Sequence, residues 1–442
     1  MSTLRRALAT LPAPAGRLAV GYSGGRDSTA LLHAVRGAHP ERVLRAIHVC
    51  HHMQAEAEHW AAHCRAQCAA LGVGFTRLDV DVATAGVEGR EAAARRARYD
   101  AVAAALGGDE LFLTAHHAED QAETFLLQAL RGAGLAGLAA MPVLRPLGAA
   151  QHWRPWLAVE RATITDYARR HRLEWIEDPS NCDLSLDRAW LRERLWPILS
   201  ERYPAAARTL ARSSGHAAAG RRTVADLASR DHADAVDAAG RLDTTVLSAL
   251  TADRQRALLR HWLDAQARDA PDQRHIEQIR ALPGSRRTAS PCVRFGSTEV
   301  RAFGDHLYAM AVLASAPFDW SSDWDGRQPL ELPAGCGRLV WVVETGVEDA
   351  RLQVAFRRGG ERVAGRDGHH RALKDVLREQ RVAPWLRGRI PLVYAQTVLV
   401  AAGDVWRHPE IERLLGGRGI HFHWRDAPAG AVARVVDVPP FG

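Results

Sequence analysis

The sequence predicts an α/β fold, a doubly wound parallel sheet, for residues 1–215 of its 442 residues. Apolar stretches of strand length alternate there with helical stretches, which is the pattern of parallel strands joined by helical crossovers. The first strand, from Leu18, runs directly into two glycines and then into a helix that continues through Val35. Because open α/β sheets bind ligands at the carboxyl ends of their strands, we expect the functional site there.

The remaining elements follow in order. In 1–215, further strands are predicted at 43–49, 75–82 and 110–115, and helices at 55–71, 91–106, 119–130 and 164–170. Helical spacing dominates 216–315, with short strands at 292–295, 298–303 and 306–310, which predicts a mostly helical middle domain. A polar linker at 321–328 precedes a small α+β domain at 330–442. The predicted domains are therefore 1–215, 216–315 and 330–442.

The turn after the first strand has the composition of a phosphate-binding loop. Its residues are Ser23, Gly24, Gly25, Arg26, Asp27 and Ser28. Glycines let the backbone approach a ligand, and the N-terminus of the following helix attracts anions. Asp27 would repel phosphate unless a divalent cation lay between them. A Walker-type loop is excluded because it needs a Gly-Lys pair, and the single lysine, Lys374, follows a leucine.

Composition narrows the class of protein. The net charge is +7 and the isoelectric point is near 9.4, which suits a polyanionic partner. The six cysteines include no CxxC pair, so reduced structural thiols are favoured over a metal site. No apolar run reaches membrane-spanning length, so we expect a cytoplasmic protein without a membrane contact. The sequence leaves a monomer and a homodimer both open.

A second informative stretch follows the strand at 110–115. Asp120 and Glu123 are three residues apart on a helix and share a face, close to His116. Two carboxylates in a strand-end pocket need a cationic partner, either Mg²⁺ or an ammonium ligand. The alternative is a solvated acidic first turn favoured by the helix dipole. Arg95 and Arg98 lie on the same side of a helix. They could contact ATP phosphates or nucleic acid, and a solvated face is the alternative.

The string at 23–28 resembles the pyrophosphate-binding loop of the PP-loop (N-type) ATP pyrophosphatases, which split ATP into AMP and pyrophosphate. Further motifs in a fixed order make the chain resemble the tRNA(Ile)-lysidine synthetase family. They are SGGRDS, the His51-His52 pair, EAAARRARY, AHHAEDQAET, RGAGLAGLAAM, WIEDPSN and DRAWLR, spanning about residues 17–215. The resemblance implies a Rossmann-like PP-loop ATPase fold. Within the superfamily, tRNA thiolases are disfavoured, because they need paired cysteines.

The resemblance also implies an activity. The family activates C2 of the wobble cytidine in a CAU-anticodon tRNA(Ile) with ATP, and the ε-amine of free L-lysine then displaces AMP. Implied roles are Mg²⁺-ATP binding by Ser23 through Ser28, with Asp27 at the metal, and lysine recognition by Asp120 and Glu123. His116 lies near the reacting centre, and Arg95 and Arg188 contact phosphate. Either His116 or a carboxylate is the general base.

Two positions depart from the family pattern. Glu119 stands where an Asp usually precedes Asp120, and Ala189 replaces the Asn that usually follows Arg188. The first departure keeps a negative charge, and the second removes an amide beside Arg188.

The C-terminal region is the most basic part of the chain. Residues 351–389 hold 11 basic and four acidic side chains, an excess of +7 that equals the excess of the whole chain. With Trp385 among the arginines, this segment suits a phosphate backbone, and it resembles the family's tRNA-binding C-terminal domain. We expect tRNA contacts from Arg357, Arg358, Arg366, Lys374 and Arg387. A solvated basic face is the alternative.

Overall fold

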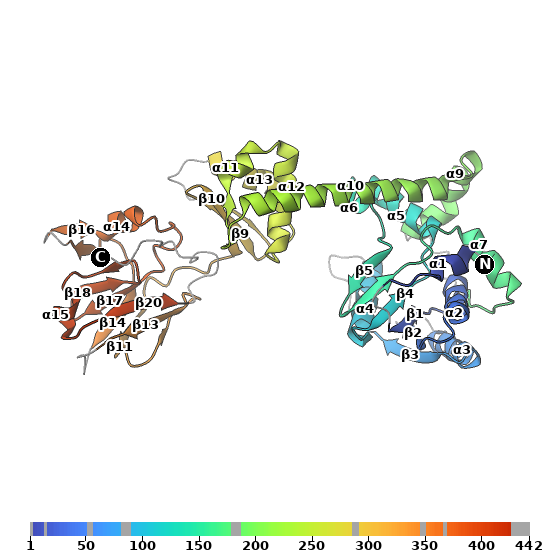
Figure 1. Cartoon of the computed structure of the whole chain (residues 1–442), viewed down its shortest axis with the longest axis horizontal. Helices are drawn as coiled ribbons and strands as arrows, with labels where there is room; N and C mark the ends of the chain where they lie inside the picture. The colour runs from blue at the N-terminus through green and yellow to red at the C-terminus, as the bar shows by residue number, and fades with distance from the viewer. Residues whose placement is uncertain are drawn as a thin grey trace. The chain divides into compact units, whose positions relative to one another are not determined.

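A computed structural model describes residues 3–12, 16–50, 56–80, 90–177, 187–284, 291–344, 351–365 and 369–425. The chain forms two compact units, Met1–Thr223 and Val224–Gly442, which we treat separately (Figure 1). The long helix α10 (Ala206–Ala235) contains the residues at which one unit passes into the other. No helix in the described ranges has the length and apolar character needed to cross a membrane.

The first unit is built on a six-stranded sheet in the order β3-β2-β1-β4-β6-β5. Its strands are β1 (Arg17–Gly21), β2 (Leu44–Cys50), β3 (Gly74–Asp79), β4 (Glu110–Leu113), β5 (Leu144–Leu147) and β6 (Ala150–Trp153). All neighbours pair in parallel except β5 and β6. The predicted doubly wound sheet is confirmed, with an antiparallel edge strand that the sequence analysis missed.

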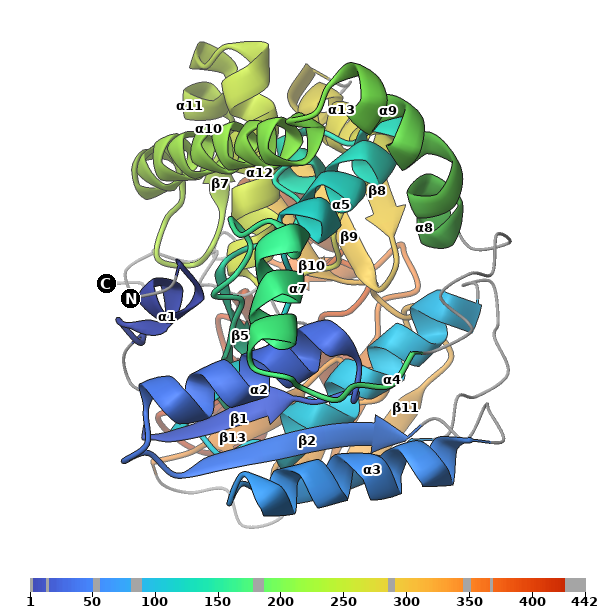
Figure 2. The ribbon, with the colours of Figure 1, turned by 90° about the vertical axis from the view of Figure 1, so that its right-hand side faces the viewer.

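Helices cover both faces of this sheet, and Figure 2 shows α2, α3 and α4 beside it. One face packs against α1 (Thr3–Leu8), α2 (Arg26–Ala38), α3 (Ala57–Ala70) and α7 (Arg161–Arg170). The other face packs against Val102 of α4 (Arg90–Ala105) and against Leu106, which follows this helix. The strand order reverses between β1 and β4, so the crevice at their carboxyl ends is the topological switch point.

Further helical segments belong to the first unit. They are α5 (Ala118–Leu130), α6 (Leu135–Leu138), α8 (Asp187–Trp190), a π-helical turn (Leu191–Leu195) and α9 (Trp196–Arg202). The π-helical turn ends two residues before Pro197, which has no N–H to donate to the carbonyl four residues earlier. Such turns occur frequently at functional sites.

The second unit begins with a four-stranded antiparallel sheet, β7-β10-β9-β8. Its strands are β7 (Leu242–Asp243), β8 (Cys292–Phe295), β9 (Thr298–Phe303) and β10 (His306–Ala311), and three of them confirm the predicted strands. The helices α11 (Thr244–Ala249), α12 (Ala252–Ala265) and α13 (Gln273–Ala281), with a 3₁₀ turn (Leu282–Gly284), complete this part. Trp262 and Leu258 of α12 are fully buried in its core.

The rest of the second unit is rich in β-structure. A five-stranded sheet contains β11 (Ser321–Trp324), β14 (Leu352–Phe356), β17 (Pro391–Ala395), β18 (Val398–Ala402) and β19 (Trp406–Arg407). A three-stranded sheet contains β12 (Leu330–Glu331), β13 (Arg338–Val342) and β20 (His421–Arg425), and β15 (Arg362–Ala364) pairs with β16 (His370–Ala372). Two helices accompany them, α14 (Leu373–Glu379) and α15 (Ile411–Leu415).

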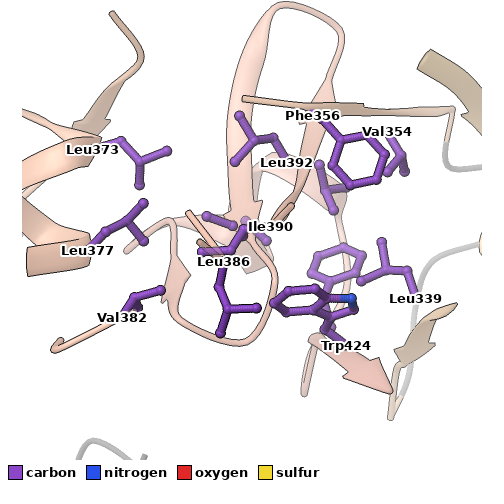
Figure 3. Packing of buried hydrophobic residues seen from close by; sticks show 14 of the residues in the cluster. Leu339, Val354, Phe356, Leu373, Leu377, Val382, Leu386, Ile390, Leu392 and Trp424 are labelled. Atoms are coloured by element: carbon purple, nitrogen blue, oxygen red, sulfur yellow. The ribbon is translucent and has the colours of Figure 1, made fainter. Parts of the chain in front are cut away.

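The core of this region contains Leu339, Phe356, Leu392 and Trp424, which Figure 3 shows together. The predicted polar linker at 321–328 is wrong, because Ser321–Trp324 forms β11 and buries Trp324 in this core. Tyr308 and Met310 of β10 also belong to this core. We keep the division into 1–215, 216–315 and 330–442 as a proposal.

Candidate active site

The loop after β1 has a backbone that requires glycine. Gly24 adopts a φ of +83°, and a Cβ there would lie 2.9 Å from Cys64 Sγ and 2.9 Å from Ile176 Cδ1. Gly25 is the N-cap of α2 and has no side chain with which to cap it. Ser28 donates its hydroxyl to the Gly25 carbonyl at 2.9 Å and lies 3.1 Å from Ser23 Oγ. The first amides of α2 are therefore available to an anion.

A cavity of about 450 Å³ opens at the switch point. Six of the predicted site residues line it, namely Ser23, Asp27, Ser28, Arg95, His116 and Asp120. Arg98, which the sequence analysis placed on the same helix side as Arg95, lines it as well. So does His48 near the end of β2. The sequence analysis had assigned no role to Trp60, Tyr99 and Thr114, which complete part of the wall.

Asp27 faces a histidine that the sequence analysis overlooked. His117 is 3 % exposed, and its Nε2 lies 3.7 Å from Asp27 Oδ2 and 3.4 Å from Asp120 Oδ2. Burial alone would lower the pKa of His117, but Asp27, Glu119 and Asp120 raise it to about 10. Burial would likewise raise the pKa of Asp27, but His117 and Arg26 lower it to about 2. Both groups are therefore charged at neutral pH.

Glu119, the first departure from the family pattern, has a structural partner. Its two carboxylate oxygens accept from the backbone N–H of Arg161 at 3.1 and 3.0 Å, at the start of α7. One of these oxygens also lies 3.0 Å from His117 Nδ1. Glu119 therefore ties α7 to the beginning of α5 and holds the ring of His117.

Asp120 and Glu123 already have a cation within the protein. Arg192 donates to both carboxylate oxygens of Glu123 at 2.6 and 2.9 Å and to Asp120 Oδ1 at 2.7 Å. The sequence analysis expected Mg²⁺ or an ammonium ligand as the cationic partner of this pair and did not foresee Arg192, which the π-helical turn brings onto both carboxylates. The side chain of Glu123 is 3 % exposed, so the pair is not the solvated acidic turn that we also considered.

Arg188 is oriented without the usual amide after it. Its Nη2 donates to Thr124 Oγ1 on α5 at 3.0 Å, and Ala189 is buried beside it. Arg95 stacks on Tyr99 in the cavity wall, with its Cζ 5.2 Å from the centre of the Tyr99 ring. Arg188 and Glu123 do not line the cavity itself. Arg188, on α8, contacts Thr124 of α5, and Glu123, on α5, shares Arg192 with Asp120.

His116 is held by a hydrogen-bonded series of side chains. Thr114 Oγ1 lies 2.7 Å from His116 Nδ1 and 2.8 Å from His152 Nε2. His152, on β6, is wholly buried, and its Nδ1 lies 3.4 Å from Arg145 Nε and 3.2 Å from Arg154 Nη2. Burial lowers the pKa of His116 to about 3 and that of His152 to about 2, and neighbouring arginines, Arg154 first among them, add to both effects.

The predicted tRNA-binding residues belong to the second unit, and the structure gives them different settings. Lys374 on α14 and Arg358 are exposed, whereas Arg357 and Arg387 are half-buried. Arg357 pairs with Glu361 at 3.1 Å, and Arg387 donates to the Val382 carbonyl at 2.9 Å. Trp385 is 9 % exposed and lies against Phe303 and Tyr308, so its predicted availability to nucleic acid is wrong.

Three sequence features fall outside the described residues. They are Arg366, the His51-His52 pair and the end of the WIEDPSN motif from residue 178.

The chemistry of the loop fits magnesium with Asp27 as a single protein ligand. Asp27 is ionised and lines the cavity, and Mg²⁺ commonly takes one or two carboxylates plus phosphate and water oxygens. In the described residues no three His, Cys, Asp or Glu side chains gather into a site of their own for a metal.

The parallel sheet, the glycine loop at its switch point and the ionised Asp27 define a PP-loop ATP-using enzyme domain. The family model described as a PP-loop domain matches residues 2–199. Models of the TilS substrate binding domain and the TilS substrate C-terminal domain match residues 242–308 and 352–424. The chain belongs to the tRNA(Ile)-lysidine synthase family.

Curated relatives with this family name are similar to nearly the whole chain. The tRNA(Ile)-lysidine synthase of Xanthomonas campestris pv. campestris (strain 8004) is 39% identical over 95% of this chain and 97% of its own. That of Alkalilimnicola ehrlichii is 41% identical, over 91% of this chain and 92% of its own. The Pseudomonas aeruginosa protein of the same name is 40% identical, over 88% and 90%.

Proposed function

We propose that this enzyme joins free L-lysine to C2 of the wobble cytidine in a CAU-anticodon tRNA(Ile), through an adenylated intermediate. ATP is cleaved to AMP and pyrophosphate, and the modified tRNA reads AUA. The main support for this proposal is one cavity that is lined both by the glycine loop and by Asp120. Glu123 lies beside Asp120, because Arg192 donates to both carboxylates. ATP, lysine and tRNA meet in the cytoplasm, where we place the reaction.

The triphosphate is assigned to the loop and the first turn of α2. Ser23, Gly24, Gly25, Arg26 and Ser28 surround the open amides there, and Asp27 would hold Mg²⁺. The ion, when bound, neutralises phosphate charge and polarises the phosphoryl oxygens. Arg95 and Arg188 supply fixed positive charge for the phosphates, which stabilises negative charge as the α-phosphorus is attacked.

The lysine site is assigned to Asp120 and Glu123. The guanidinium of Arg192 on these carboxylates supports the assignment, because it shows that the pocket accepts a cationic group. A lysine ammonium must therefore share the two carboxylates with Arg192 or displace it. Burial raises the pKa of Glu123, and Arg192 opposes this by lowering it. The ionisation of Glu123 therefore depends on a neighbouring cation.

The tRNA is assigned in part to the basic segment at 351–389. The exposed Arg358 and Lys374 support direct phosphate contact, and Arg357, Arg366 and Arg387 belong to the same segment.

Incubation with tRNA(Ile), ATP and labelled lysine, followed by nucleoside mass analysis, tests the proposal. We expect one labelled lysidine per CAU anticodon and none without ATP. Asp27→Ala should abolish the product, whereas Asp166→Ala, which removes an exposed carboxylate on α7, should leave it unchanged. Binding of tRNA without any modified nucleoside would instead indicate a non-catalytic RNA-binding protein.

A further inference from the structure

A fully buried histidine outside the cavity is connected to one inside it. His152 on β6 and His116 after β4 both contact the hydroxyl of Thr114, and no other described polar atom is recorded within hydrogen-bond distance of Thr114 Oγ1. The order along the series is Arg145 and Arg154, then His152, then Thr114, then His116. The strand pairing of β4 with β6 brings these residues together, with Phe112 beside His152 in the register.

The two arginines at the start of the series determine the direction in which its hydrogen bonds are donated. A guanidinium has only donors, so His152 Nδ1 must accept from Arg145 and Arg154. A neutral imidazole has one donor and one acceptor, so the proton of His152 is on Nε2 and is donated to Thr114 Oγ1. The Thr114 hydroxyl then has its own proton left to donate, and His116 Nδ1 lies 2.7 Å away.

The opposite arrangement leaves a group unsatisfied. If His116 Nδ1 also donated to Thr114, the threonine oxygen would accept twice, and its hydroxyl proton would have no partner among the described side chains. A buried hydroxyl is more stable when it donates its proton to an acceptor than when that donor has no partner. The arrangement with Thr114 as donor satisfies every member of the series.

We infer that Thr114 and His152 are positioning residues that hold His116 as the neutral tautomer protonated on Nε2. His116 then presents a hydrogen-bond donor to the cavity that it lines. Its Nδ1 lone pair is used by Thr114 and its Nε2 already carries a proton, so the ring cannot accept a proton from an incoming amine. This removes His116 from the two candidates for general base.

The role of that donor rests on the proposed function. A neutral N–H aimed at the reacting centre stabilises negative charge that develops on an oxygen, on phosphate or on the cytidine O2, without repelling the cationic amine. A carboxylate is then left as the base, with Asp120 lining the same cavity.

The test is the tautomer of His116 in the full chain. Long-range ¹H–¹⁵N spectra of ¹⁵N-histidine-labelled protein distinguish the two neutral tautomers and the charged ring, and His116→Gln identifies the signal. We expect a protonated Nε2 and an unprotonated Nδ1 in the wild type. A protonated Nδ1, alone or in a charged ring, would overturn the inference.

Thr114→Val and Thr114→Ser form a matched pair, since only the second keeps the hydroxyl. We expect the valine variant to shift the His116 signals towards a mixture of tautomers and to lower kcat by about 10- to 100-fold, with KM for ATP and lysine nearly unchanged. Serine should restore the ring signals and turnover. Unchanged ring signals in the valine variant would contradict the inference.

The same data separate this inference from the proposed function. A wild-type chain that makes no lysidine contradicts the function alone, because the ring signals are read without turnover. A wild-type chain that makes lysidine with Nδ1-protonated His116 contradicts only the positioning role.

Discussion

At the scale of single residues, the site is a set of charges that compensate one another across the crevice. His117 balances Asp27, Glu119 and Asp120, and Arg192 balances Asp120 and Glu123. The sequence predicted the loop and the acidic pair, because each lies within one short motif. It could not predict the contacts of His117 with Asp27 or of Arg192 with Glu123, since these join residues 90 and 69 positions apart.

Removing Arg192 should expose the dependence of the acidic pair on a cation. Arg192→Ala leaves Glu123 buried and unpaired, so we expect a loss of about 3 kcal/mol in the free energy of unfolding. If lysine binds these carboxylates, saturating L-lysine should raise the melting temperature of the variant, and L-norleucine, which lacks the ammonium group, should not. Equal responses to both amino acids would place lysine elsewhere.

The carboxylates should also determine the lysine requirement. We expect Asp120→Asn and Glu123→Gln each to raise the KM for lysine about tenfold or more, because each removes a charge-assisted contact to an ammonium. Steady-state assays at fixed ATP and tRNA measure this, with Asp166→Ala as the control. An unchanged KM in both variants would contradict the lysine site.

The buried histidines give stability a defined pH dependence. The pKa values of His152 and His116, about 2 and about 3, lie below the value of about 6.5 for an unfolded histidine. Below pH 6.5 the unfolded chain therefore binds more protons, so stability falls as the pH is lowered. Each group contributes up to about 1.4 kcal/mol per pH unit.

His152→Gln should therefore make this slope shallower by about 1 kcal/mol per pH unit between about pH 5 and 6.5. The charged and titratable groups around His152 are Arg154, Arg145, Arg95 and His116, and they remain in the variant. Urea unfolding at several pH values measures the slope. An identical slope in wild type and variant would mean that His152 is protonated in the folded chain.

At the scale of elements, the loop conformation decides whether the crevice can hold phosphate. Gly24 cannot carry a side chain at φ +83° without meeting Cys64 and Ile176. We expect Gly24→Ala to cost about 1–3 kcal/mol of stability and to weaken ATP binding. Gly215→Ala is the matched control, since its Cβ would meet nothing within 4 Å, and in helix α10 it should stabilise by about 0.5–1 kcal/mol. Similar effects of both substitutions would refute the argument.

Several strands escaped the sequence analysis, and two of them, β6 and β11, show the physical reasons. β6 is only four residues long and carries His152 at a core position, so its apolar signature is weak. β11 reads Ser-Ser-Asp-Trp and buries only its tryptophan, which resembles a linker. Longer strands such as β2 and the regular helices were predicted correctly, because their apolar residues recur at a regular spacing that indicates a buried face.

At the scale of the whole molecule, the charge is unevenly distributed along the chain. The excess of +7 in 351–389 accounts for the formal net charge of +7. We expect Arg358→Ala with Lys374→Ala to weaken tRNA binding and to reduce the slope of log K against log[salt] by about 2. The control pair is Arg274→Ala with Arg413→Ala, which removes two exposed arginines of the same unit outside the segment. Equal salt slopes in the two double variants would contradict this assignment.

The central claim is that the loop and the acidic pair serve one reaction at one end of the sheet. The most direct measurement quantifies AMP and lysidine in the same sample, with ATP in excess and lysine varied. We predict one AMP for each lysidine formed on CAU tRNA(Ile), and no lysidine on a tRNA with another anticodon. Lysidine formed without AMP would contradict the account. So would an Asp120→Asn variant that releases AMP and incorporates lysine as fast as the wild type.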